Sequence, residues 1–185
     1  MNNIESLYQE IFNDFTLNEN QQKRCKLACA MALEAENLPE KSLVRSVIVA
    51  QILANLKLDD ETLVATLISD GNLEVIYPYE NIVEHFGEPT AKLVEGIRTL
   101  NKFKDFDVER KSNEVQNERL RQMLLAMTSD IRIMIMKLAY RVARLRQLKN
   151  ESEVIRHQIA AETELIFSPL ANRLGIAQLK WELED

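Results

Sequence analysis

Apolar residues recur every three or four positions along nearly the whole chain, which is the spacing of one face of an α-helix. A clear example is the stripe formed by Val44, Val47, Ile48, Ile52 and Leu56. Similar stripes predict helices over these ranges: 4–15, 18–36, 42–56, 60–70, 79–86, 89–103, 117–130, 131–148 and 151–174. We therefore expect an all-α fold of about eight to ten helices, without a sheet of any size.

Several residues indicate where these helices begin and end. Residues suited to N-capping precede three of the predicted helices: Asn18, Asp59 or Asp60, and Asp130. Gly87 is a natural C-terminal residue for the short helix before it. Pro169 lies inside the last predicted helix, where it removes a backbone hydrogen bond, so we expect a kink or a restart at that point.

Composition supports the helical interpretation and narrows the class of protein. The 185 residues include only 4 glycines and 4 prolines, too few for the turns of an all-β fold. The formal net charge of −6 argues against a nucleic-acid-binding domain. The first ten residues lack the features of a signal peptide, and no apolar run has membrane-spanning length. A soluble, cytoplasmic domain is expected.

The residue types that usually bind metals are few and scattered. Cys25 and Cys29 lie one helical turn apart, a poor geometry for a disulfide, so we expect reduced, buried thiols. His85 and His157 are isolated and typical of surface or satisfied core histidines. The chain contains no glycine-rich phosphate-binding loop.

Three basic residues share one face of the helix predicted over 131–148. They are Lys137, Arg141 and Arg144, beside an apolar stripe on the same helix. One interpretation is a solvated face whose long side chains cover the core. The other is a contact with an anion or a partner, and the sequence leaves both open.

Longer segments resemble a known family. They are FGEPTAKLVEGIRTLNK (86–102), RLRQMLLAMTSDIRIMIMKLAYRVARLRQL (119–148) and ETELIFSPLANRLGIAQLKWELED (162–185). They resemble the N-terminal hydrolase (HD) domain of the long RelA/SpoT proteins, which make and degrade the alarmone (p)ppGpp. The resemblance covers roughly residues 40–185 and implies an HD-like helical bundle.

In active members of that family, two histidines and two aspartates hold a divalent metal, typically manganese. The resemblance places these ligand positions at Arg45, Ser69, Asp70 and Tyr140. A guanidinium only donates hydrogen bonds, and neutral hydroxyls are poor ligands, so Asp70 alone gives no useful affinity. We therefore expect neither a bound metal nor another cofactor in this chain.

Other family positions have changed as well. The acidic pair that positions the attacking water falls on Leu73 and Glu74, and a family asparagine falls on Arg144. Arg45 and Arg144 therefore bring two cations to the former site. We expect Arg45 to bond Asp70 directly in place of the metal, with Tyr140 filling the remaining volume. The alternative is that Arg45 points to solvent.

The resemblance also implies a division of the chain. Residues 1–167 correspond to a degenerate HD domain, and 168–185 to the start of a connection to a synthetase domain. The sequence stops at KWELED with acids at the end of a predicted helix, which suggests a piece of a longer protein. Leu179, Trp181 and Leu183 are then expected to be exposed toward the following domain.

Three functions remain open. The first is a catalytically inactive, regulatory HD domain of a (p)ppGpp synthetase of the RelA branch, which uses ATP and GTP or GDP. The second is an active metal-dependent phosphohydrolase whose metal site is rebuilt from Asp70, Glu74 and other carboxylates. The third is a stand-alone helical interaction module. The first implies an adjacent synthetase domain and a ribosome-associated parent protein, with no direct nucleic-acid or membrane binding by this domain.

Overall fold

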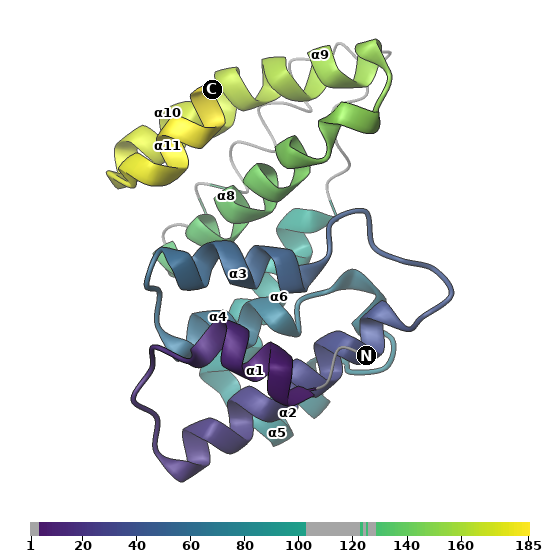
Figure 1. Cartoon of the computed structure of the whole chain (residues 1–185), viewed down its shortest axis with the longest axis vertical. Coiled ribbons are helices and arrows are strands. Elements are labelled where there is room, and N and C mark those ends of the chain that lie inside the picture. The colour runs from purple at the N-terminus through teal and green to yellow at the C-terminus, as the bar shows by residue number, and fades with distance from the viewer. Residues whose placement is uncertain (1–3, 103–122, 124, 126–128) are drawn as a thin grey trace. The chain divides into compact units, whose positions relative to one another are not determined.

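The computed structural model describes residues 4–102, 123, 125 and 129–185. Helices, and no strands, account for the regular structure of these residues, so the all-α prediction is confirmed (Figure 1). The chain divides into two compact units, Met1–Arg98 (unit 1) and Thr99–Asp185 (unit 2). None of the helices in the described ranges is long and apolar enough to cross a membrane.

Unit 1 contains the N-terminal helices of the chain. They are α1 (Ile4–Phe12), α2 (Glu19–Glu36), α3 (Ser46–Asn55), α4 (Asp60–Leu67), the short 3₁₀ helix η1 (Gly71–Leu73), α5 (Tyr79–Phe86) and α6 (Glu88–Asn101), whose last residues belong to unit 2. Helix α4 packs against α2 and α3, and α1 packs against α2 and α3. The core is formed by buried side chains that include Ile11, Phe12, Ala28, Leu53, Leu63, Leu67, Ile82, Leu93 and Ile97.

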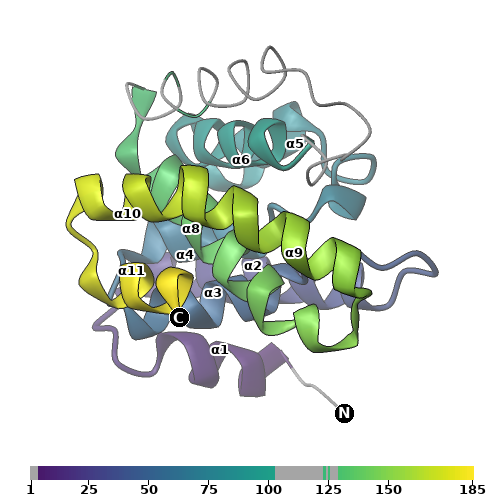
Figure 2. The ribbon, with the colours of Figure 1, turned by 90° about the horizontal axis from the view of Figure 1, so that it is seen from above.

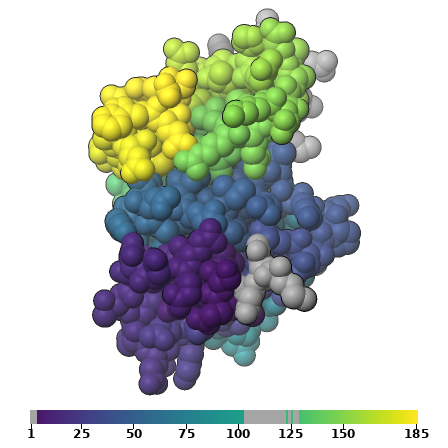
Figure 3. Space-filling model, viewed as in Figure 1, coloured from purple at the N-terminus to yellow at the C-terminus, as the bar shows by residue number. Residues whose placement is uncertain are grey.

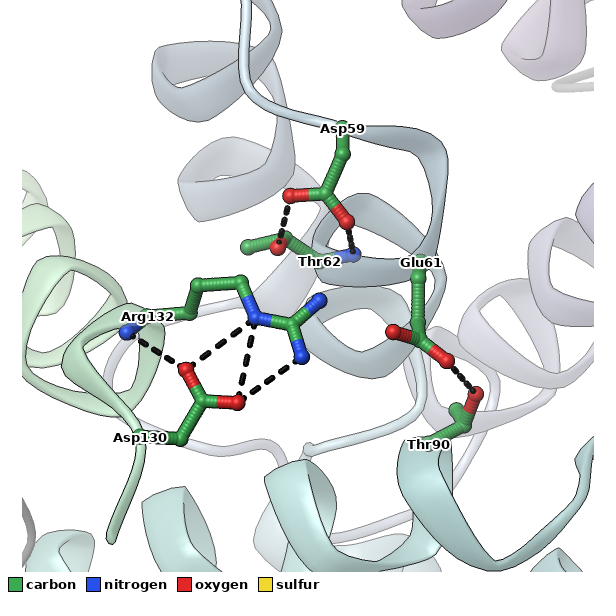
Figure 4. Close-up of polar contacts among 6 residues, drawn as sticks. All are labelled: Asp59, Glu61, Thr62, Thr90, Asp130 and Arg132. Carbon is green, nitrogen blue, oxygen red and sulfur yellow. Dashed lines mark hydrogen bonds and ion pairs between the residues drawn. The ribbon is translucent and has the colours of Figure 1, made fainter.

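The predicted N-caps of unit 1 are present. Asn18 accepts a hydrogen bond from the backbone of Gln21 at 2.9 Å, and the Gln21 side chain accepts one from the Asn18 backbone at 3.0 Å. This reciprocal capping box satisfies two otherwise unpaired backbone donors at the start of α2. Asp59 caps α4 by accepting from both the backbone and the hydroxyl of Thr62 (Figure 4). Gly87 ends α5 with a φ of 91°, a conformation that favours glycine.

Cys25 and Cys29 lie on α2 as free, fully buried thiols, as predicted. Burial raises the pKa of each thiol from 9.0 to about 12, because the interior penalises the charged thiolate. The folded state therefore holds these protons more tightly than the unfolded state. The resulting stability is present below about pH 9 and is lost as the pH rises toward 12.

We expect neither thiol to react with an aromatic disulfide reagent in the folded protein near neutral pH. Both should react quickly once denaturant unfolds the chain, since the thiolate is the nucleophile and needs access as well as ionisation. The measurement is the absorbance of the released chromophore with and without denaturant. Rapid modification of even one thiol in the native protein would contradict this prediction.

Unit 2 contains the remaining described helices. They are α8 (Ile131–Arg146), η2 (Leu148–Asn150), α9 (Glu153–Glu162), the π-helical segment η3 (Thr163–Phe167), α10 (Ser168–Leu174) and α11 (Ala177–Glu184). Helices α9 and α10 follow one line with η3 between them (Figure 2). Helix α11 folds back and packs against α8, α10 and η3.

Local sequence signals predict the ends of these helices well. Asp130 caps α8 by accepting from the backbone of Arg132 at 2.9 Å, and its carboxylate also pairs with the Arg132 guanidinium (Figure 4). Hydrogen bonds from the Arg132 side chain lower the pKa of Asp130. Pro169 lies in the first turn of α10, directly after the π-helical segment. The expected kink or restart takes the form of this π-helical segment, after which α10 begins at Ser168 without a break in the helical backbone.

The C-terminal segment differs from the expectation of an exposed face. Leu179 and Leu183 are buried, at 1% and 7% exposure, whereas Trp181 is 69% exposed. The prediction is therefore wrong for the two leucines, because α11 packs against α8, α10 and η3 within this same chain. Figure 3 shows the C-terminal residues, in yellow, in contact with green residues of unit 2. The boundary between a degenerate HD domain (1–167) and a connecting segment (168–185) stays a prediction. The polar stretch over 104–115 and most of the helix predicted over 117–130 lie outside the described residues.

Candidate functional site

Two segments of unit 1 carry most of the positions that the sequence singled out. Arg45 is the N-cap residue of α3, while Ser69 and Asp70 follow the end of α4. Hydrogen bonds join these segments, because the Ser46 hydroxyl donates to the carbonyl of Leu67 at 2.9 Å. The structure therefore brings the start of α3 and the end of α4 together, as expected of one site.

Asp70 is held by short polar neighbours. It is only 6% exposed, and its Oδ1 accepts hydrogen bonds from the Ser42 hydroxyl at 2.6 Å and the Asn72 backbone at 3.0 Å. The Asn72 side chain in turn donates to the carbonyl of Glu40 at 2.8 Å. The carboxylate thus caps η1 and ties the loop before α3 to the loop after α4.

The predicted bond between Arg45 and Asp70 is wrong. The Arg45 guanidinium pairs instead with Glu36 at the end of α2, with Nη1 and Oε1 3.3 Å apart. Arg45 sits before the first turn of α3 in an extended conformation, and its side chain is 45% exposed. Ser42, three residues earlier, reaches Asp70 with a short hydroxyl and satisfies it.

Arg98 supports the same region and was missed by the sequence reasoning. It is 6% exposed, and its guanidinium donates to the carbonyls of Ile68 at 2.8 Å and Tyr77 at 3.0 Å. A cation at the C-terminal end of α4 is favoured by the helix dipole. The Tyr77 hydroxyl donates to Glu34 at 2.6 Å, and this bond, together with burial, raises the pKa of Tyr77. The loop that follows Asp70 is therefore fixed at both ends.

The two positions that the resemblance assigned to the water-positioning pair, Leu73 and Glu74, lie in and directly after η1. Leu73 is fully buried and lies in η1, while Glu74 follows it and is half-buried. A buried leucine offers no group that could accept a proton from water. The Ser69 hydroxyl donates to the carbonyl of Thr66 at 2.7 Å, so it serves the end of α4.

Tyr140 and Arg144 lie on α8 in unit 2. Tyr140 is 8% exposed and Arg144 6%, so both positions are buried. The Arg144 guanidinium pairs with Glu151 at 2.8 Å. Arg144, which the sequence analysis assigned to the former metal site as a cation, therefore has a carboxylate partner within unit 2.

The basic stripe on α8 is not a solvated face. Arg141 is 5% exposed and pairs with Glu162 at 3.0 Å. Lys137 donates to the side chain of Asn101 at 3.0 Å. The interpretation as a solvated face is wrong for Arg141 and Arg144, because acids on following elements neutralise both inside the unit.

The donors of unit 1 do not fit a catalytic metal. Among the described residues, no three His, Cys, Asp or Glu side chains gather closely enough to hold an ion. His85 is exposed and bonds the carbonyl of Asn81, and the His157 side chain is 80% exposed beside Glu153. Of the two alternatives for the histidines, surface or satisfied core positions, the structure shows the surface. The single carboxylate at this position, Asp70, accepts two hydrogen bonds and so acts as a structural acceptor. The arrangement therefore holds together the loop before α3 and the loop after α4.

Comparisons with known proteins now identify the relatives of this chain. It matches the HD domain family over residues 26–177. It is 40% identical over 174 residues to the bifunctional (p)ppGpp synthase/hydrolase SpoT of Escherichia coli strain K12, covering 91% of this chain and 24% of that protein. It is 42% identical over 146 residues to a GTP pyrophosphokinase of Myxococcus xanthus, covering 79% and 19%.

A third relative carries a hydrolase name. The guanosine-3′,5′-bis(diphosphate) 3′-pyrophosphohydrolase of Haemophilus influenzae is 42% identical over 146 residues, which are 79% of this chain and 21% of that protein. The chain spans a quarter or less of the length of these curated relatives.

Proposed function

Because this chain belongs to the HD domain family, among the RelA/SpoT proteins, we propose that it is an HD domain that has lost (p)ppGpp hydrolysis. Its remaining role is regulatory: it packs beside a (p)ppGpp synthetase domain and tunes it. The observation that carries the proposal is the state of Asp70, whose carboxylate caps η1 and bonds Ser42 while Arg45 pairs elsewhere.

The chemistry of metal-assisted hydrolysis supports this proposal. The ion must be held by several ligands and must keep an open position where bound water loses its proton. Arg45, Ser69 and Tyr140 supply no such ligand, because the first is a permanent cation and the others are neutral hydroxyls. The buried Leu73 removes one of the two acids of the water-positioning pair.

The names of relatives favour a second candidate. Two of the three relatives described above are named for hydrolysis, which favours an active (p)ppGpp hydrolase with a site rebuilt from Asp70 and Glu74. The Myxococcus relative, in contrast, is named a GTP pyrophosphokinase. We place the chain with the synthetases of the RelA branch because of its own substitutions at 45, 69, 73 and 140.

The parent protein in this proposal is a GTP pyrophosphokinase of the stringent response. It transfers pyrophosphate from ATP to GTP or GDP, and it is cytoplasmic and ribosome-associated, as the RelA branch implies. The length of the relatives supports a further synthetase domain, since each is more than four times as long as its match to this chain.

The test is turnover of ppGpp by the purified chain with manganese present. We expect pyrophosphate release no faster than the metal-free blank, because the donors needed to activate water are missing. The matched positive control is the hydrolase domain of the Escherichia coli relative, cut to the same 174-residue match. Manganese-dependent release above the blank would favour the second candidate, and loss of that release in Glu74→Gln would locate its base.

A further inference from the structure

The helical line from α9 to α10 contains one wide turn. Residues Thr163–Phe167 form a π-helical segment, in which the Ser168 backbone N–H donates to the carbonyl of Thr163, five residues earlier. Such turns are rare and usually occur where a function or a packing constraint requires them. In Figure 2 the turn lies between α9 and α10 without a visible break in their common direction.

The wide turn keeps one stripe of side chains buried. Ile159, Thr163, Phe167 and Ala171 are each at most 2% exposed, and they repeat at intervals of exactly four residues. An α-helix has 3.6 residues per turn, so a repeat of four drifts around it. The extra residue taken up by the π turn corrects this drift and keeps the stripe facing the core of unit 2.

Arg141 on α8 contacts both ends of this turn. Its guanidinium pairs with Glu162, the last residue of α9, at 3.0 Å. The same guanidinium lies over the ring of Phe167, the last residue of η3, with its Cζ 4.2 Å from the ring centre. The Arg141 and Glu162 side chains are 4% and 3% exposed, and Phe167 is fully buried.

The spacing of these two contacts selects the π turn. Glu162 and Phe167 are five residues apart, and in an α-helix such positions point to different sides. In a π turn the hydrogen bond itself joins residues five apart, so both side chains come to one face. One cation can then hold a carboxylate and an aromatic ring at once, with water excluded from both contacts.

We propose that Arg141 is the positioning residue that sets the helical register of residues 163–167. It thereby sets the direction of α10 and the placement of α11, which packs on α8. Pro169 assists, because it has no N–H to continue an α-helical ladder from α9. Residues beyond the turn depend on this register: Leu179 and Leu183 of α11 are buried, and Glu182 pairs with Arg146 of α8. A one-residue change of register would rotate all of them away from α8.

The first experiment replaces Arg141 and Glu162 and follows the placement of α11. The double variant Arg141→Met with Glu162→Met removes the cation without leaving a lone buried carboxylate. Trp181 is the only tryptophan of the chain and lies on α11, so its emission reports the placement of this helix. We expect a shift of the emission maximum and faster hydrogen exchange of the Phe167 and Ser168 amides. An unchanged emission and unchanged exchange would overturn the proposal.

The second experiment removes the extra residue itself. Deletion of Leu165, which is 66% exposed, brings Glu162 and Phe167 to a separation of four, where an α-helix satisfies both contacts. This deletion should leave folding and the Trp181 emission intact. Deletion of His157, exposed on α9, is the matched control and should abolish cooperative unfolding, because α9 has no extra residue to lose.

Combining the two changes separates positioning from mere stability. In the chain that lacks Leu165, the segment has only the α-helical register available. The double methionine variant should therefore no longer shift the Trp181 emission. An equal shift in both backgrounds would show that Arg141 contributes packing alone and would overturn the proposal. Should the double variant fail to fold, Phe167→Leu, which keeps the ion pair and removes the ring under Arg141, must shift the Trp181 emission in the complete chain and leave it unchanged in the chain that lacks Leu165.

Discussion

Replacing Glu162 by alanine should lower the free energy of unfolding by about 3–5 kcal/mol, the largest loss that we expect from substituting one buried residue. Both side chains of the Arg141–Glu162 pair are almost fully buried, so alanine leaves a guanidinium in the interior without its carboxylate. The cost of an uncompensated buried charge exceeds the value of the pair itself. Urea unfolding followed by circular dichroism measures the loss.

Two further variants make this expectation specific. Glu88→Ala removes the exposed partner of Lys92 and should hardly change the free energy of unfolding, since exposed pairs are screened by water. Replacing both Arg141 and Glu162 by methionine should restore only part of the stability lost in Glu162→Ala: no lone charge remains, but the contacts that set the register of residues 163–167 are also gone. A loss for Glu162→Ala no larger than that for Glu88→Ala would contradict the argument.

The helices and their ends could be predicted because their causes are local. Asn18, Asp59 and Asp130 each cap the helix that follows, through bonds to residues two or three positions ahead. Such contacts depend on the chain immediately around them and not on the tertiary fold. For the same reason Pro169 indicated a change in the last long helix, which is the π-helical segment directly before α10.

The partners of buried charges could not be predicted in this way. Arg141 and Arg144 lie on a helix whose spacing fits a solvated face as well as a buried one. Their acids, Glu162 and Glu151, lie on other segments, and only the packing of unit 2 brings them within reach. Sequence periodicity gives the face of a helix but not what that face meets.

The hydrogen bonds of Asp70 could not be predicted from the charges around it. The sequence placed Arg45 and Asp70 in one region, and the hydrogen bonds between their segments agree. Charge alone suggested that Arg45 would replace the metal. The Arg45 guanidinium instead pairs with Glu36, and Ser42 and Asn72 donate the hydrogen bonds that Asp70 accepts. An Asp followed two residues later by Asn is a turn signal that could have indicated this.

Asp70→Ala should therefore behave as the loss of a structural acceptor, lowering the free energy of unfolding by about 2–3 kcal/mol. The Ser42 hydroxyl and the Asn72 backbone N–H would lose their common acceptor, and the two loops would separate. Asp70→Asn should cost less than about 1 kcal/mol, because the amide oxygen can still accept both bonds.

A metal ligand would give a different pattern in the same measurement. Manganese would then stabilise the natural chain in proportion to its concentration, and Asn and Ala at position 70 would both abolish this gain. Since a carboxylate that caps η1 depends on geometry and not on an ion, we expect unfolding curves that do not move with manganese. Asp14→Ala, at an exposed ion pair with Lys57, serves as the reference for an unimportant acid. Equal losses for Asp70→Asn and Asp70→Ala, together with stabilisation of the natural chain by manganese, would return Asp70 to the role of a ligand and favour the active hydrolase.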